Sequence, residues 1–227
     1  SRLAASLVKL KQFAAAVEAA RKDGAISTWK NVCKACVEAK EFKLAHQAGL
    51  HVIVQADELE DLIRFYERRG YFNDMLELLE DGLHQENAHP SLKTELAILY
   101  SKYSPQKLMK HIQAYHDTIT IPKVASVVDK NQQWSELCFL YTKYGEFDKA
   151  INCMIKHSAD AWDHITFKET ILRVSNIDLY DEGLKFYANE QPPLVNDYLK
   201  TIASVVENRR VVSTAKKNGY LSLIKPY

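Results

Sequence analysis

Two segments of this chain repeat each other, and the spacing of their apolar side chains limits the fold more than any other feature. Residues 95–103 read ELAILYSKY and residues 136–144 read ELCFLYTKY, identical at six of nine positions with serine and threonine exchanged at a seventh. A third copy, DLIRFYERR, occupies residues 61–69. In the first two copies leucine and tyrosine fall at i, i+3, i+4 and i+7, the stripe that one face of an α-helix buries. The sequence therefore predicts recurring amphipathic helices.

A second helix is predicted after each stripe, because an aromatic residue follows ten positions after the first stripe residue. The pairs are Leu3 with Phe13, Val32 with Phe42, Leu62 with Phe72 and Leu137 with Phe147. Three positions later come mostly small side chains, which allow two helices to approach closely: Ala16, Ala45, Met75 and Ala150. The unit is a helical hairpin. Its turns are expected at Lys11–Gln12, Lys40–Glu41, Gly70–Tyr71 and Gly145–Glu146.

Such a hairpin is too small to bury its own apolar stripe, so neighbouring hairpins must cover it. We therefore expect an all-α fold, an α-solenoid of stacked antiparallel hairpins with about fourteen to sixteen helices. Further helix starts are expected at a capping box of Asp57 with Glu60, at Pro90, at Ser104 with Pro105, and at Pro122. No linker divides the chain, and both ends are apolar. The prediction is one continuous domain over residues 1–227, cut from a longer chain.

Composition and charge narrow the class of partner. Thirty lysine and arginine residues against 29 aspartate and glutamate leave a net charge of +1, which argues against a nucleic-acid or membrane-surface binder. The longest stretch without a charged residue, Leu44 to Ala56, is too short to span a bilayer. Four scattered cysteines and the absence of a signal peptide favour a reduced, cytoplasmic setting. The expected partners are proteins.

Two side-chain patterns suggest chemistry, and each has a simpler explanation. Cys33, Cys36, His46 and His51 form a C-x2-C followed by H-x4-H, which is a candidate zinc site. The interval is short for a zinc finger, and the cysteines occupy apolar stripe positions, which favours buried thiols. Cys138 and Cys153 are placed to form a disulfide or to remain inert thiols. Because no catalytic constellation is present, we expect no enzyme activity, metal or cofactor.

Charge is unevenly distributed along the chain. Residues 57–86 hold ten acidic and three basic residues, a local net charge of −7, whereas residues 200–227 hold six basic and one acidic, a net of +5. One interpretation is ordinary solvated helix faces. The other is that the two oppositely charged surfaces orient partner proteins or neighbouring copies.

Several segments resemble the clathrin heavy-chain family, in the proximal part of its leg. They are TWKNVCKACVEAKEFKLAHQAGLHVIVQADELEDLIRFYERRGYF at 28–72, TELAILYSKYSPQKL at 94–108, IPKV at 121–124, DAWDHITFK at 160–168 and LIKPY at 223–227. ADELE, RGYF, ELAILYSK and KPY come in the order and spacing of the family, which generic helical repeats would not reproduce. The resemblance extends over essentially the whole chain.

The resemblance implies a structural coat protein whose legs form a polyhedral lattice on the cytoplasmic face of coated pits and vesicles. It implies two kinds of partner, the clathrin light chain and other heavy-chain legs, with the membrane reached only through adaptors. The light-chain positions of the family correspond to Lys102 and Lys107, and a further basic position corresponds to Gln191, which carries no charge. Two alternatives are a helical-repeat tethering or trafficking adaptor and a metalloenzyme or zinc-stabilised domain.

Overall fold

The computed structural model describes residues 1–224, and these residues form helices without a strand among them. The α-helices are α1 (Arg2–Lys9), α2 (Phe13–Asp23), α3 (Ile26–Glu38), α4 (Phe42–Val52), α5 (Ala56–Arg69), α6 (Phe72–Gly82), α7 (Ser91–Tyr103), α8 (Leu108–Tyr115), α9 (Ile121–Lys130), α10 (Trp134–Tyr144), α11 (Phe147–Lys156), α12 (Ser158–Ala161), α13 (His164–Ile171), α14 (Asp178–Glu190), α15 (Val195–Ile202) and α16 (Asn208–Asn218). Two 3-10 helices are η1 (Pro105–Lys107) and η2 (Pro192–Leu194). Their packing in adjacent pairs confirms the all-α fold and the α-solenoid of helical hairpins.

The second helix of each regular hairpin begins on an aromatic residue, as the ten-residue spacing predicted. These first residues are Phe13 of α2, Phe42 of α4, Phe72 of α6 and Phe147 of α11. The small residues three positions later are fully buried, and at Ala45 the carbonyl oxygen lies 3.3 Å from the Cys33 sulfur on α3. At Ala16, Ala45 and Ala150 the small side chain therefore allows the paired helices to approach closely, whereas α6 buries the larger Met75 at this position.

The hairpin turns fall where they were predicted, and each contains one residue in the left-handed region. Gly70 and Gly145 have φ of +75° and +84°. The corresponding positions of the first two hairpins hold Lys11 and Lys40, with φ of +57° and +61°. In each turn the next amide donates to a carbonyl in the last turn of the first helix, which is the Schellman arrangement. The turn geometry is thus kept even where the sequence offers no glycine.

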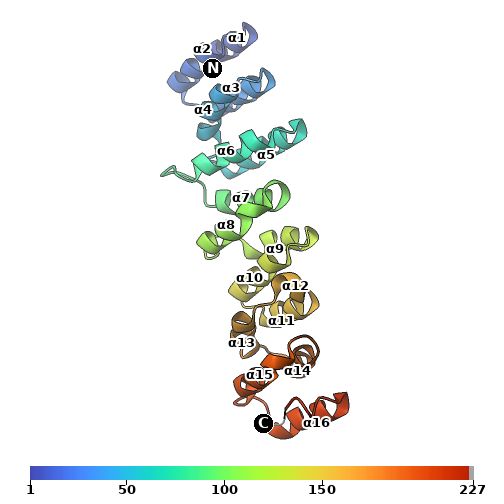
Figure 1. Ribbon diagram of the computed structural model, residues 1–227. Helices are drawn as coiled ribbons and strands as arrows, with labels where there is room; N and C mark the ends of the chain where they lie inside the picture. Colours follow the sequence, from blue (N-terminus) through green and yellow to red (C-terminus); the bar gives the residue numbers. More distant parts are fainter. Residues whose placement is uncertain (225–227) are drawn as a thin grey trace. The chain divides into compact units, whose positions relative to one another are not determined.

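The helices form two compact units, one of Ser1–Thr120 and one that begins at Ile121. In the first unit the hairpins α1–α2, α3–α4 and α5–α6 follow one another, and α7, η1 and α8 come next (Figure 1). There α3 packs on α1 and α5, while α4 packs on α2 and α6. In the second unit α11 contacts α10, α13 and α14, and α14 contacts α15 and α16. Within each unit, neighbouring helices bury each other's apolar faces. One continuous domain remains a prediction.

The tryptophans lie mostly against histidines of their own hairpin. Trp29 is buried and stacks on His51 at 4.1 Å between ring centroids. Trp134 stacks on His157 at 3.6 Å, in the α10–α11 pair. The two stacks join the start of one helix to the end of its partner, so these rings stabilise the hairpin itself.

Three local predictions need correction. The capping box is wrong, because α5 begins at Ala56 and Gln55 occupies its N-cap without a side-chain bond, so that Asp57 stands inside the first turn. There its carboxylate interacts favourably with the positive end of the helix dipole. Ser104 does precede η1, but its hydroxyl accepts from the Gln106 side chain and caps no amide. Tyr144, predicted to belong to a buried stripe, is 54% exposed.

Two further expectations concern the end of the chain and the membrane. The KPY of the family resemblance occupies residues 225–227 and lies outside the described residues. In the part of the chain that the structure describes, no helix has both the length and the apolar character that a membrane span requires.

Candidate functional site

The two lysines implied by the resemblance lie on the consecutive elements α7 and η1 of the first unit. Lys102 is in the last turn of α7, and Lys107 is the last residue of η1. Their side chains are 41% and 49% exposed, and each is paired with a carboxylate of the preceding α5–α6 hairpin. The structure therefore places both ammonium groups at the surface, each beside a carboxylate of the same neighbouring hairpin.

Glu67 on α5 is the carboxylate beside Lys102. Its Oε1 lies 3.5 Å from the Lys102 Nζ and accepts a hydrogen bond of 2.8 Å from the Tyr103 hydroxyl. Partial burial and this contact with Glu67 raise the pKa of Tyr103 to about 12. Tyr103 also stacks on Phe72 at 4.1 Å, which fixes the end of α7 against the start of α6. These contacts of Tyr103 hold the end of α7, which carries Lys102, against the α5–α6 hairpin.

Glu80 on α6 has the same role for Lys107. Its Oε1 accepts hydrogen bonds of 2.6 Å from the Lys107 Nζ and 2.7 Å from the Tyr100 hydroxyl. Burial alone would raise the pKa of Glu80, but the bonds from Lys107 and Tyr100 outweigh it and hold the pKa below its usual value. The Lys107 ammonium also lies 5.8 Å from the centre of the Tyr100 ring.

Both lysines remain able to bind a partner carboxylate. An ammonium group has three N–H donors, and one surface ion pair uses only part of this capacity. Exposed pairs of this kind contribute about 0–1 kcal/mol, so they do not hold the lysines against a stronger competitor. The chemistry available here is recognition of acidic side chains.

A groove of about 440 Å³ adjoins Lys107, between α6 and α8. Its surface combines apolar and aromatic side chains with a second ammonium group, and includes Leu83, Tyr100, Lys107, Lys110, Ala114 and Tyr115. Lys93 adds a further cation 4.7 Å from the centre of the Tyr115 ring. An apolar floor with ammonium groups at its edge fits an amphipathic helix that has an apolar stripe and acidic flanks.

Gln191, the uncharged position of the implied surface, belongs to the second unit. It is the residue after α14, and its amide donates to the Tyr187 carbonyl at 2.9 Å. Pro192 then begins η2, just as Pro105 begins η1 after Ser104. The two units thus repeat a helix, a cap, a proline-led 3-10 turn and a second helix, and Gln191 occupies the place that Ser104 has in the first.

The four candidate zinc ligands each have other surroundings or contacts and are not brought together as a metal site. Cys33 and Cys36 are buried on α3, and burial raises the pKa of their thiols to about 12 and about 11. His46 Nε2 lies 2.9 Å from an Asp81 carboxylate oxygen on α6, and His51 stacks on Trp29. Among residues 1–224, no group of three or more histidine, cysteine, aspartate or glutamate side chains is arranged to hold a metal ion.

The second cysteine pair lies within the α10–α11 hairpin. Cys138 and Cys153 are both free and buried, and their sulfurs lie 3.8 Å from the carbonyl oxygens of Ala150 and Trp134 respectively. Of the two alternatives left open by the sequence, the structure has thiols and not a disulfide. The contact with Cys153 and burial both raise the pKa of Cys138.

Sequence reasoning missed the carboxylates that hold the two lysines. Glu67 precedes Lys102 by 35 positions, and Glu80 precedes Lys107 by 27. The separation of 27 is close to the 29 and 30 residues between the aromatic residues that open successive second helices, whereas the separation of 35 is longer. A search for opposite charges about one repeat apart would therefore have found Glu80 but not Glu67.

Comparison with known proteins agrees with this architecture. The family described as the region in clathrin and VPS matches residues 50–195. The full 227 residues align with clathrin heavy chains from Dictyostelium discoideum at 51% identity and Drosophila melanogaster at 48%, and with human clathrin heavy chain 2 at 43%. The chain spans only 13–14% of the length of these relatives. With the family match over more than half of its residues, the chain belongs to the clathrin heavy-chain repeat family.

Proposed function

We propose that this chain is a structural segment of a clathrin coat, without catalytic activity, and that its surface around Lys102 and Lys107 binds the clathrin light chain. The observation that carries the coat role is the 43–51% identity to clathrin heavy chains across all 227 residues. Agreement over the whole chain favours the coat over a tethering adaptor built from the same repeat. The place of action is then the cytoplasmic face of coated pits and vesicles, with attachment to the membrane through adaptors.

Stacked hairpins suit a coat because each contacts only its neighbours. A small change at every interface adds up to a gradual bend, so a leg can be stiff and still adjust to lattices of different curvature. Contacts between legs can be individually weak, because many of them act together once a lattice has formed. Weak individual contacts also allow the lattice to come apart again.

The light-chain site is supported by the charges and groove of the first unit. Lys102 and Lys107 present half-exposed ammonium groups, and the groove beside Lys107 offers apolar surface for a helix. In this proposal an acidic residue of the light chain shares each ammonium with Glu67 or Glu80. The apolar stripe of the light-chain helix lies on Leu83 and Tyr115.

Reversing the charge of either lysine is expected to weaken light-chain binding by about 10- to 100-fold. The estimate follows from about 1.5–3 kcal/mol for a hydrogen bond to a charged group. The measurement is the dissociation constant of a labelled light-chain fragment by fluorescence anisotropy, for Lys102→Glu and Lys107→Glu. The affinity of the unaltered chain should also fall as salt is raised from 50 to about 300 mM, because added ions screen exposed charges.

Two controls separate loss of contact from loss of structure. Lys102→Gln and Lys107→Gln remove the charge without repelling Glu67 or Glu80, and should retain the helix content in circular dichroism. Lys22→Glu makes the same charge reversal at an exposed residue of α2 and should bind normally. Normal binding by both reversed variants would remove the lysines from the site, and no binding to the unaltered chain would remove the site itself.

Restoring a positive charge at Gln191 is expected to strengthen light-chain binding. The Gln191→Lys side chain lies at the half-buried cap after α14, and the substitution leaves the hydrogen bond from the backbone amide of residue 191 to the Tyr187 carbonyl intact. The same anisotropy assay should show an affinity about three- to tenfold higher, the range expected of about 0.5–1.5 kcal/mol for one added hydrogen bond. Gln191→Met has a similar length without charge and serves as the matched control. Equal affinities for the two variants would place residue 191 outside the light-chain site.

A further inference from the structure

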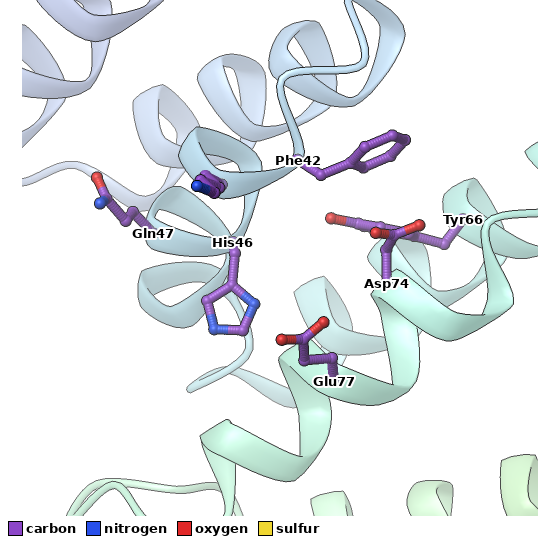
Figure 2. Close-up of a pocket in the computed structure, with 7 residues that line it drawn as sticks. Phe42, His46, Gln47, Tyr66, Asp74 and Glu77 are labelled. Carbon is purple, nitrogen blue, oxygen red and sulfur yellow. The ribbon is translucent and has the colours of Figure 1, made fainter.

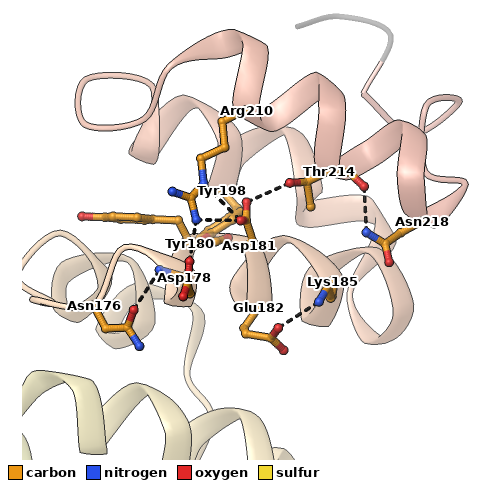
Figure 3. A network of polar contacts seen from close by, with 10 residues as sticks. All are labelled: Asn176, Asp178, Tyr180, Asp181, Glu182, Lys185, Tyr198, Arg210, Thr214 and Asn218. Carbon is orange, nitrogen blue, oxygen red and sulfur yellow. Dashed lines mark hydrogen bonds and ion pairs between the residues drawn. The ribbon is translucent and has the colours of Figure 1, made fainter.

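The last described helix, α16, is fixed to α14 by one of its faces (Figure 3). Arg210 Nη2 lies 2.8 Å from carboxylate oxygens of both Asp178 and Asp181. Thr214 donates a hydrogen bond of 3.0 Å to the other oxygen of Asp181. Val211 and Ala215 on the same side are buried. This clamp sets the rotation of α16 about its axis and so decides which side chains face outward.

The outward face of α16 is basic with an apolar centre. Arg209, Val212 and Lys216 stand at i, i+3 and i+7 and are all exposed, Val212 at 45%. Such positions lie on one face of a helix. Within the described residues neither Arg209 nor Lys216 forms an ion pair, in contrast to Arg210. An exposed apolar side chain between two unpaired cations can contact an apolar residue and two carboxylates of a partner.

A surface of opposite charge lies in the first unit, where a cavity of about 480 Å³ opens between α4 and α6 (Figure 2). Phe42 supplies aromatic surface, the buried Tyr66 forms part of the lining, and Asp74 and Glu77 line the α6 wall. Neither carboxylate forms an ion pair with another described residue, whereas Glu80 on the same helix is paired with Lys107. The cavity thus offers two unpaired negative charges beside aromatic rings, which fits lysine or arginine side chains of a partner.

The α4 wall carries the opposing charges that such a partner would meet. His46 is already paired with Asp81 at 2.9 Å, and Lys43 is exposed at the rim. The two carboxylates therefore outnumber the one free ammonium group. Lys43 weakens the attraction of the cavity for a basic partner. Replacing Lys43 with an acidic residue should therefore strengthen binding of such a partner.

We propose that α16 of one copy of this chain docks on the α4–α6 cavity of a second copy. Arg209 and Lys216 pair with Asp74 and Glu77, and Val212 packs against Phe42. Charge complementarity selects this occupant, because residues 57–86 carry a net charge of −7 and residues 200–227 a net of +5 in the same chain. The two surfaces differ, so the contact is heterologous and can continue from copy to copy, as a lattice requires. The inference deepens the proposed coat function, since it names one contact between heavy chains.

Cross-linking between two variants that each carry one added cysteine tests this contact. One variant carries Gln47→Cys, at an exposed position that lines the cavity, and the other carries Ser213→Cys on the outward face of α16. The four native thiols are buried, which favours reaction at the added ones. A short bismaleimide is added to a 1:1 mixture at low salt, and the heterodimer is measured on a denaturing gel. Lys22→Cys on α2 replaces Gln47→Cys as the control.

The expected heterodimer yield is at least fivefold above that of the control. It should fall to the control level with Asp74→Lys/Glu77→Lys or with Arg209→Glu/Lys216→Glu, and return when the two reversed partners are mixed. Asp74→Asn/Glu77→Gln should give an intermediate yield, and Lys43→Glu a higher one. A yield equal to the control, or one that the reversals do not change and restore in this way, overturns the contact.

Light-chain binding by the same variants separates this inference from the proposed function. Asp74, Glu77, Arg209 and Lys216 are not part of the Lys102 and Lys107 surface, so the substituted chains should bind the light-chain fragment normally. Failed cross-linking with normal light-chain binding removes only the contact between copies. Normal cross-linking without light-chain binding removes only the light-chain site.

Discussion

Replacing Phe167 with alanine is expected to lower the free energy of unfolding by about 3–5 kcal/mol, because it leaves a cavity that the surrounding rings cannot close. Phe167 on α13 is fully buried. Its ring lies among aromatic neighbours, at centroid distances of 5.9 Å to Phe186, 5.5 Å to Tyr187 and 6.1 Å to Tyr198. These rings come from α14 and α15, so the substitution loosens three helices at once. Urea denaturation followed by circular dichroism measures the change.

The matched control lies two residues away on the same helix. Ile165 is 67% exposed, and Ile165→Ala should change the free energy of unfolding by no more than about 0.5 kcal/mol. The slope of free energy against urea has to be compared as well, because stacked repeats can lose cooperativity, and a changed slope would reveal this. Similar losses for Phe167→Ala and Ile165→Ala would mean that the aromatic cluster does not stabilise the second unit.

The hairpins could be predicted from the sequence because the rules that form them are local. The stripe from Leu137 to Leu140, the aromatic start at Phe147 and the turn at Gly145 all fall within a dozen residues. Helix period and turn geometry act over that distance, so the pattern determines them. The turn at Lys40 was found from spacing alone, since lysine gives no sign of its left-handed backbone.

Contacts between hairpins were harder to predict, because they depend on the stacking register. Asp61 lies 2.6 Å from Lys34, 27 residues earlier, and Asp197 lies 2.6 Å from Lys168, 29 residues earlier. Arg69 reaches Glu38 across 31 residues. Each separation is about one repeat, because stacking brings equivalent positions of successive hairpins side by side. The register therefore links charges that look unrelated along the chain.

The candidate site likewise depends on contacts between hairpins that the sequence did not predict. Lys102 and Lys107 were identified only through the resemblance, since nothing in their periodicity distinguishes them from other surface lysines. Their supports, Glu67 and Glu80, come from the previous hairpin. The cavity that holds Asp74 and Glu77 exists only once α4 and α6 have packed, and the sequence indicated no more than an excess of acidic residues there.

The second large effect is expected at Gly183, in the interior of α14. Alanine is normally about 0.5–1 kcal/mol more favourable than glycine within a helix. Here an added Cβ would collide with the phenol of Tyr198 on α15, with the ring carbon Cζ only 2.9 Å away. Tyr198 is fully buried, and its hydroxyl donates to the Tyr180 carbonyl at 2.9 Å, so the ring cannot move aside without losing that bond. Gly183→Ala should therefore destabilise the chain by about 2–4 kcal/mol.

A double-mutant cycle with Tyr198→Phe identifies the cause. Removing the hydroxyl costs about 1 kcal/mol by itself, through the lost bond to Tyr180. It also removes the phenol oxygen that an alanine at position 183 would meet, so the second substitution should cost less in this background. We expect Gly183→Ala/Tyr198→Phe to be more stable than the sum of the single losses by about 1–2 kcal/mol, as residues in direct contact can show. Additive losses would mean that Gly183 is needed for another reason than the approach of Tyr198, and a stabilised Gly183→Ala would mean that α14 and α15 do not pack this closely.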